Sequence, residues 1–298
     1  MAGRPQAVGA ILILTLLGAF IPFFWLLSGA IIALITLRMG FMQVLWVISW
    51  SAVLLSIVSL GLFGTSSRLG LVGTFAASAG FGLAQWLPVA VFAWPLRRWA
   101  SWSFVMQAIG VAGMVAVLLV QVFNPDMTAV WQRFLDEALG GSMQRFGMDA
   151  AQARIAIDSI APYFTGILAT LIATGISFSL ILGRYWQSVL YNPGGFAEEF
   201  TRWKASSAFS GLMLALSVAA IVLHQSLLMQ MMLVGLVPFF FQSLGLAHAL
   251  VKLYNMSTGW LVGLYVLLVF MTLQMAALLT AIGLVDGFMD IRRRLAKR

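Results

Sequence analysis

Polar side chains that lie inside apolar stretches are the residues of this chain that could do chemistry. Six glutamines lie in such stretches, namely Gln85, Gln107, Gln121, Gln230, Gln242 and Gln274. In hydrocarbon, a neutral amide can hydrogen-bond to a neighbouring helix, at roughly 0.6 to 2 kcal/mol each, or it can line a cavity for a polar neutral ligand. We take Gln85, Gln230 and Gln242, together with His248, as candidate ligand-binding residues. The interhelical role stays open for the three glutamines and for His248, which lies near the end of a segment and can hydrogen-bond to a neighbouring helix.

The histidines and the absence of cysteine restrict the remaining chemistry. His224 and His248 are the only histidines, 24 residues apart, and neither has a carboxylate near it in the same segment, so they are poor evidence for a metal site. The chain has no cysteine, which excludes disulfides, thiolate metal sites and cysteine nucleophiles. We expect no metal, no cofactor and no enzymatic activity. An enzyme that acts on lipid, with His224 or His248 as base, ranks last among the functions considered.

Carboxylates are nearly missing from the apolar segments. Asp286, at the very end of the last segment, is the exception. Proton-coupled and cation-coupled pumps usually need an ionisable residue within a span. Autonomous secondary transport is therefore disfavoured, and a passive binder driven by another subunit fits better.

The elements that position these residues follow from composition. Hydrophobic residues make up 62% of the chain and charged residues 9%, against about 25% charged in an ordinary soluble domain. Because hydrocarbon leaves a bare backbone without hydrogen bonds, each spanning segment must be a helix or part of a closed barrel. The apolar runs are continuous and do not alternate as barrel strands do. The sequence predicts an all-α, polytopic bundle that forms one transmembrane domain over residues 1–298, with the lipid bilayer as its surroundings.

Apolar runs of about 20 residues, the length that crosses a bilayer, predict eight or nine membrane segments. They are 7–21 and 23–37 (a pair divided at Pro22), 41–63, 70–95, 102–123, 160–183, 205–223, 225–251 and 258–285. The first run continues past Pro22 without a convincing cleavage site, so we read it as a retained segment and not as a signal peptide.

Two stretches break the apolar pattern. Residues 124–158 carry three arginines and five acidic residues, and we expect a helical hairpin outside the membrane or resting on it, with Asp126 and Asp149 as helix N-caps. Residues 184–204 contain Asn192-Pro193-Gly194-Gly195, a turn sequence. Phe196, Phe200 and Trp203 then fall on one helix face, which predicts an interfacial helix.

The net charge of +8 bears on topology more than on partners. Five of the 17 basic residues lie in the last seven positions, Arg292, Arg293, Arg294, Lys297 and Arg298. We read this tail as an orientation signal that contacts anionic lipid on the cytoplasmic side, and we expect no nucleic-acid binding.

The charge rule also tests the span count. If 225–251 crosses once, nine basic residues lie inside and eight outside, which is no bias. If 225–251 dips in and returns at Pro238, 12 lie inside and five, including Lys252, lie outside. The charge rule favours the re-entrant alternative. One continuous kinked helix is equally acceptable by length.

One stretch resembles a known family. It runs Arg184-Tyr185-Trp186-Gln187-Ser188-Val189-Leu190-Tyr191-Asn192-Pro193-Gly194-Gly195-Phe196, with Glu199-Phe200 following. It is similar to the most distinctive stretch of the YybS-like family of bacterial multi-pass membrane proteins, a family of unknown function. Further matches are 245–251 with His248, the pair Gly259-Trp260, and 286–294. The family-motif loop is accordingly Arg184, Tyr191, Asn192, Pro193, Gly194, Gly195, Phe196 and Phe200.

The resemblance has implications for function. The YybS-like family is distantly similar to the S components of energy-coupling-factor transporters, which implies a helical membrane domain that binds a small molecule and relies on partner proteins for energy. S components have six spans, fewer than the eight or nine counted here. We expect a small-molecule-binding or transport-associated subunit of the bacterial cytoplasmic (inner) membrane, with a cytoplasmic C-terminus. The alternative is a membrane scaffold or assembly factor whose 124–158 hairpin and 192–204 loop recruit partner proteins.

Overall fold

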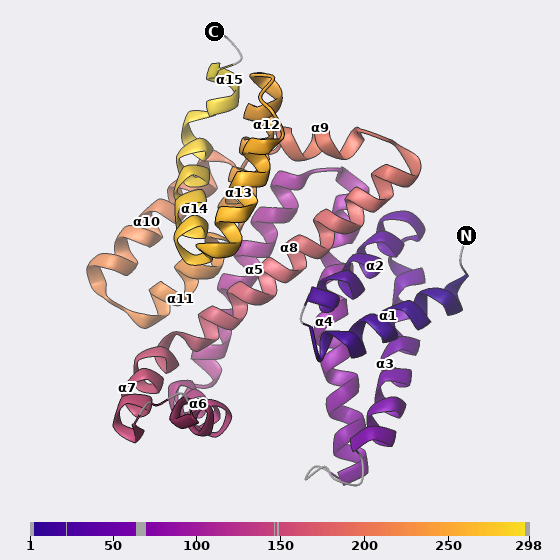
Figure 1. Ribbon diagram of the computed structural model, residues 1–298, viewed down its shortest axis with the longest axis vertical. Coiled ribbons are helices and arrows are strands. Elements are labelled where there is room, and N and C mark those ends of the chain that lie inside the picture. Colours follow the sequence, from indigo (N-terminus) through magenta and orange to yellow (C-terminus); the bar gives the residue numbers. More distant parts are fainter. Residues whose placement is uncertain (1–2, 22, 64–69, 146, 148, 296–298) are drawn as a thin grey trace. The chain divides into compact units, whose positions relative to one another are not determined.

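The computed structural model describes residues 3–21, 23–63, 70–145, 147 and 149–295 (Figure 1). All regular secondary structure in these ranges is helical, which confirms the all-α class. Pro22, where the first pair of segments was expected to divide, lies outside the described residues, as do Lys297 and Arg298 of the basic tail. The helices on either side of Pro22 are α1 (Arg4–Gly18) and α2 (Phe23–Met39).

Fewer helices are long enough to cross a membrane than the sequence predicts. Within the described ranges, six segments reach this length, namely Phe41–Leu62, Gly70–Trp99, Trp102–Phe123, Ala150–Tyr191, Ser226–Leu253 and Thr272–Met289. A seventh is reached if α9 (Gly195–Arg202) and α10 (Ser207–Leu223), which meet at a bend of 53°, count as one span. The expected eight or nine are not confirmed, because α1, α2 and α13 (Gly259–Phe270) have only 15, 17 and 12 residues.

The residues fall into two compact units. The first unit holds Met1–Val105 and Gly175–Phe200, and the second holds Met106–Thr174 and Thr201–Arg298. Two long helices, α5 (Trp102–Phe123) and α8 (Phe164–Tyr191), contribute to both.

The first unit is built from α1, α2, α3 (Phe41–Phe63), α4 (Gly70–Trp99), the C-terminal half of α8, and α9. Small residues bring α8 close to α2, since a Cβ on Gly183 would come within 2.6 Å of the Cβ of Ala33. Trp86 of α4 is fully buried, and its indole N–H donates to Ser28 of α2 at 3.4 Å. These contacts hold α2 between α4 and α8.

The second unit contains α6 (Met127–Arg145), α7 (Ala150–Ile160), α10, α11 (Ser226–Gly235), α12 (Val237–Leu253), α13, α14 (Thr272–Met289) and α15 (Ile291–Leu295). Helices α12 and α14 form its closest contact. A Cβ on Gly283 of α14 would lie 2.0 Å from the carbonyl oxygen of Phe239 on α12, so only glycine permits this approach. Phe239 and Phe241 are fully buried there.

The segment 124–158 forms two helices, α6 and α7, as expected. The predicted cap at Asp149 is confirmed. Its carboxylate accepts the backbone N–H of Gln152 at 2.7 Å, and the Gln152 side chain accepts the N–H of Asp149 at 3.1 Å, a reciprocal capping box. Trp131 of α6 packs against Leu135, Ile157 and Ala161. The hairpin thus has a small apolar core of its own.

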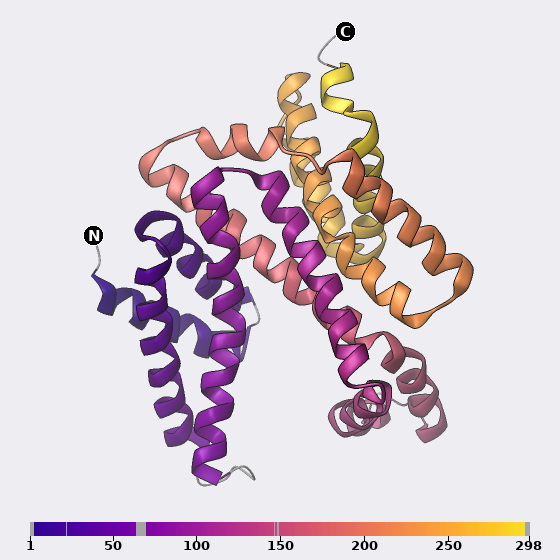
Figure 2. The ribbon, with the colours of Figure 1, turned by 180° about the vertical axis from the view of Figure 1, so that it is seen from behind.

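The segment 225–251 does not turn back on itself. Helices α11 and α12 follow one another through Leu236 and together form one apolar segment of 28 residues. Figure 2 shows α10 and α11 joined by a turn, at His224, whose φ of 53° lies in the left-handed region. The helix break just before Pro238 is therefore a kink within one segment.

The chain turns back later, at Met271. In Figure 1 it runs down along α13 and returns along α14, and Met271 between them has φ −125° and ψ 47°. The expected single segment 258–285 is thus two helices. Lys252, which the re-entrant alternative placed away from the tail, lines the same pocket as Arg202, Arg292 and Arg293. The structure therefore supports the alternative in which 225–251 crosses once, with the turn-back in the following segment.

Candidate functional site

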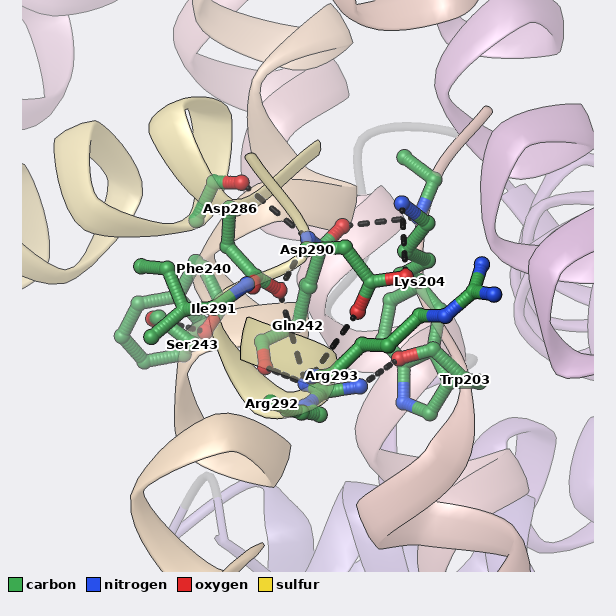
Figure 3. Close-up of polar contacts among 12 residues, drawn as sticks. Trp203, Lys204, Phe240, Gln242, Ser243, Asp286, Asp290, Ile291, Arg292 and Arg293 are labelled. Atoms are coloured by element: carbon green, nitrogen blue, oxygen red, sulfur yellow. Dashed lines mark hydrogen bonds and ion pairs between the residues drawn. The ribbon is translucent and has the colours of Figure 1, made fainter. Parts of the chain in front are cut away.

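The junction of α14 and α15 contains a buried carboxylate (Figure 3). Asp286, in the last turn of α14, has no exposed surface. One of its oxygens, Oδ2, accepts the side-chain amide of Gln242 at 2.7 Å and lies 3.8 Å from Nη2 of Arg292. The other oxygen, Oδ1, accepts the backbone N–H of Ile291 at 2.9 Å. A buried charge persists only when it is paired and hydrogen-bonded in this way.

Gln242 connects three parts of the second unit. Besides Asp286, its Nε2 donates to the carbonyl of Gly283 at 3.2 Å, and its Oε1 accepts the N–H of Ala205 at 2.8 Å. The side chain is fully buried. It ties α12 to α14 and to the segment between α9 and α10, so its amide is occupied by protein groups.

Arg292 extends this network toward the surface. Its Nη2 donates to the backbone carbonyl of Gln242 at 3.0 Å, and its Nη1 donates to the backbone carbonyl of Trp203. Burial lowers the pKa of the Arg292 guanidinium from its ordinary value, whereas the charges of Asp286 and Asp290 raise it. An arginine stays protonated in proteins at neutral pH, so Arg292 is a fixed positive charge.

Asp290 shapes the turn between α14 and α15. Its φ of 47° lies in the left-handed region, which aspartate tolerates better than most residues. The carboxylate lies 3.4 Å from Nζ of Lys204, and it accepts the backbone N–H of Arg293 at 3.4 Å. This turn sets the direction of the three arginines of α15.

A pocket opens above this network, and we call it the basic pocket. It has a volume of about 700 Å³ and is lined by Thr201, Arg202, Ala249, Leu250, Lys252, Leu253, Asp290, Arg292 and Arg293. Four of these side chains are cationic and one is a carboxylate, which is itself paired with Lys204. On the side away from the pocket, Arg292 pairs with Asp286 and donates hydrogen bonds to the backbone carbonyls of Gln242 and Trp203. The chemistry that this arrangement supports is recognition of an anion by arginine and lysine.

The four predicted ligand residues are divided between the two units. Gln85 belongs to the first unit, and Gln230, Gln242 and His248 belong to the second. Only Gln242 is connected to the basic pocket, through Arg292. His248 lies next to the pocket residue Ala249, but its Nε2 pairs with the hydroxyl of Tyr265 at 2.9 Å.

The two other glutamines make interhelical hydrogen bonds. Gln230 is 3% exposed; its Oε1 accepts the N–H of Gly166 at 3.0 Å and its Nε2 donates to the carbonyl of Pro162 at 2.9 Å. The Nε2 of Gln85 donates to Trp25 and Ser28 of α2. Most polar side-chain atoms of Gln85 and Gln230 are thus occupied by hydrogen bonds to neighbouring helices, the alternative that the sequence left open.

The family-motif loop, in the first unit, is organised around an ion pair. The guanidinium of Arg184 donates to both carboxylate oxygens of Glu199, at 2.6 and 2.9 Å, and to Gln187 at 2.6 Å. The indole N–H of Trp102 donates to the same carboxylate at 3.2 Å. This two-point contact fixes α9 against the end of α8.

The turn within this loop follows the local sequence. Helix α8 ends at Tyr191, and Asn192 and Pro193 follow it. Gly194 has a φ of 89°, in the left-handed region that favours glycine. Ser188 accepts the N–H of Phe196 at 3.1 Å, the ring of Phe196 stacks on that of Phe200, and the hydroxyl of Tyr191 accepts from Arg38. The cavity at this loop measures only about 150 Å³. The motif residues thus contact one another and line only a small cavity.

Sequence reasoning missed the basic pocket. Arg202, Lys252, Asp290 and Arg292 are scattered over three segments, and the tail arginines were interpreted as an orientation signal that contacts anionic lipid, without a pocket. The usable signal was Asp286, the isolated carboxylate in an apolar segment, because such a residue requires a cationic partner.

Comparison with family models, with curated proteins and with solved structures finds no match. Over the part of the chain that the structure describes, the fold is that of a helical protein with six or seven segments long and apolar enough to cross a membrane.

Proposed function

We propose that this chain is a membrane-embedded binding subunit that takes an anionic ligand in the basic pocket. The observation that carries the proposal is the lining of that pocket, with four cationic side chains around a volume of about 700 Å³. This volume is within the usual range for small-molecule sites. Arg292 is already oriented by buried hydrogen bonds, so binding does not have to order it.

The pocket has a preferred side of the membrane in this proposal. Arg202, Lys204, Lys252 and the arginines of α15 cluster at one end of the second unit, and Arg133 and Arg154 lie on the α6–α7 hairpin at the other end (Figure 1). Basic residues accumulate on the cytoplasmic side of bacterial inner membranes. The pocket and the C-terminus then face the cytoplasm, and the α6–α7 hairpin faces out.

A binding subunit of this kind has no evident energy source of its own. The buried carboxylate Asp286 is used to hold Arg292 and Gln242, which leaves it poorly suited to a proton or cation cycle. The resemblance to S components supports a partner that supplies energy. A scaffold that recruits proteins through 192–204 remains the alternative, and crosslinking in native membranes separates the two.

The test is ligand binding by the purified protein. We expect organic anions and phosphate esters of a broad panel to raise the melting temperature, because a ligand that binds only the folded state stabilises it. The double variant Lys252→Gln/Arg293→Gln should lose this response, and the matched control Arg133→Gln/Arg154→Gln should keep it. An equal response in both variants, or a response only to neutral compounds, would reject the basic pocket as the site.

A further inference from the structure

A second cavity adjoins the basic pocket, and we call it the apolar groove. It measures about 600 Å³ and is lined by Ala247, Leu250, Val251, Met256, Ser257, Gly259, Trp260, Leu261, Gly263, Leu264 and Leu267. None of these residues carries a charge. The groove lies between the C-terminal end of α12 and the first half of α13.

The two cavities meet at Leu250, which lines both of them. Around the last turns of α12, Ala249, Lys252 and Leu253 line the basic pocket, whereas Ala247 and Val251 line the apolar groove. A charged cavity and an uncharged cavity therefore share one helix end. A ligand that fills both must have an anionic head and an apolar body.

The outer wall of the groove is open to the surroundings. No residue of α13 is buried, and Trp260 and Val262 are 66% and 60% exposed. With 12 residues, α13 has a length of about 18 Å at 1.5 Å per residue, which is shorter than the hydrocarbon layer. A molecule already dissolved in the bilayer can reach the groove sideways, without passing through water.

We infer that the ligand of the basic pocket is an anionic phospholipid, with its phosphate among Arg202, Lys252, Arg292 and Arg293 and an acyl chain in the apolar groove. This inference rests on the proposed function and specifies its ligand. The charges match, because basic clusters next to membrane helices attract anionic head groups. A partner helix could also cover the groove, but it would leave the adjoining positive charge unexplained.

Two variants separate head group from chain. Lys252→Gln/Arg293→Gln removes charge from the basic pocket only. Gly263→Leu adds a side chain inside the groove, and a Cβ on Gly263 meets no atom within 4 Å, so the substitution fits the fold. Gly211→Leu on α10 is the matched control, since its Cβ also meets no atom within 4 Å and it lies outside both cavities.

The measurement is native mass spectrometry of delipidated, detergent-purified protein titrated with dioleoylphosphatidylglycerol, dioleoylphosphatidylcholine and, as a chain-free head group, glycerol 3-phosphate. The wild type should bind phosphatidylglycerol in preference to phosphatidylcholine. The charge variant should weaken phosphatidylglycerol binding roughly ten- to thirtyfold, at about one kcal/mol per basic residue. Gly263→Leu should weaken lipid binding and spare glycerol 3-phosphate, and Gly211→Leu should change neither.

The outcomes also distinguish this inference from the proposed function. If glycerol 3-phosphate binds as tightly as the lipid, and Gly263→Leu has no effect, the ligand is a soluble anion; the lipid is then excluded and the proposed function stands. If both phospholipids bind equally and the charge variant changes nothing, the lipid inference is overturned. If no anion binds at all, the proposed function fails with it.

Discussion

The carboxylate of Asp286 and the guanidinium of Arg292 lie 3.8 Å apart across the junction of α14 and α15. The aspartate is fully buried, and the arginine side chain is 13% exposed at the floor of the basic pocket. The pair therefore links the packing of the helices to the orientation of a residue that faces a ligand. A change at Asp286 should affect both stability and binding.

Removing the buried carboxylate should destabilise the protein strongly. Asp286→Ala removes the buried ion-pair partner of Arg292, and breaking a buried pair in this way costs about 3–5 kcal/mol. Asp158→Ala is the control, because its pair with Arg154 is exposed on both sides and such surface pairs contribute about 0–1 kcal/mol. Unfolding in mixed detergent micelles, followed by circular dichroism, measures the difference. Equal stability of the two variants would contradict the role assigned to Asp286.

Gln230 should be needed for stability and not for ligand binding. Gln230→Leu leaves the buried N–H of Gly166 and carbonyl of Pro162 unpaired, at a cost of about 1–3 kcal/mol for each group. We expect a lower melting temperature, with the affinity for phosphatidylglycerol unchanged at a temperature where the variant is folded. A normal melting temperature combined with lost binding would instead restore Gln230 as a ligand residue.

Gly283 should not tolerate even one added methyl group. In Gly283→Ala, the Cβ would lie 2.0 Å from the carbonyl oxygen of Phe239, so α12 and α14 must move apart. Overpacking of this kind costs typically 1–3 kcal/mol. In Gly263→Ala, the added Cβ meets no atom within 4 Å, so the higher helix propensity of alanine should raise the free energy of unfolding by about 0.5–1 kcal/mol. The two variants should thus shift the unfolding midpoint in opposite directions, and a shift of the same sign would argue against the close α12–α14 contact.

The turn at Met271 predicts a specific topology. Because the chain has no cysteine, single cysteines can be labelled without background. In the inner-membrane orientation proposed above, Ser257→Cys, between α12 and α13, and Glu137→Cys, on α6, should be labelled from opposite sides of the membrane. Ser257→Cys should then be protected from a reagent added outside intact spheroplasts. Labelling of both from outside would restore the re-entrant alternative for 225–251.

Local features of this structure were predictable from the sequence. The continuous apolar runs required helices, because hydrocarbon offers no other partner for backbone groups. Asp149 capped α7 as expected, since the partner of that cap, Gln152, is three residues away. The isolated carboxylate at Asp286 could be recognised from its position in an apolar segment.

The partners of these residues were decided by the tertiary structure, and so was the division of 258–285 into two helices. Gln242 meets Asp286 only because Gly283 lets α14 approach α12, a contact between segments distant in the chain. Arg292 reaches the same carboxylate through the turn at Asp290. Met271 carries no proline or glycine signal; its turn coincides with the packing of α14 against α12. An apolar segment must be buried in lipid or in protein, but its composition does not determine which of the two surrounds it. For this reason the sequence by itself determined the helical membrane class and its local caps, and the fold decided the basic pocket, the apolar groove and the direction of the last helices.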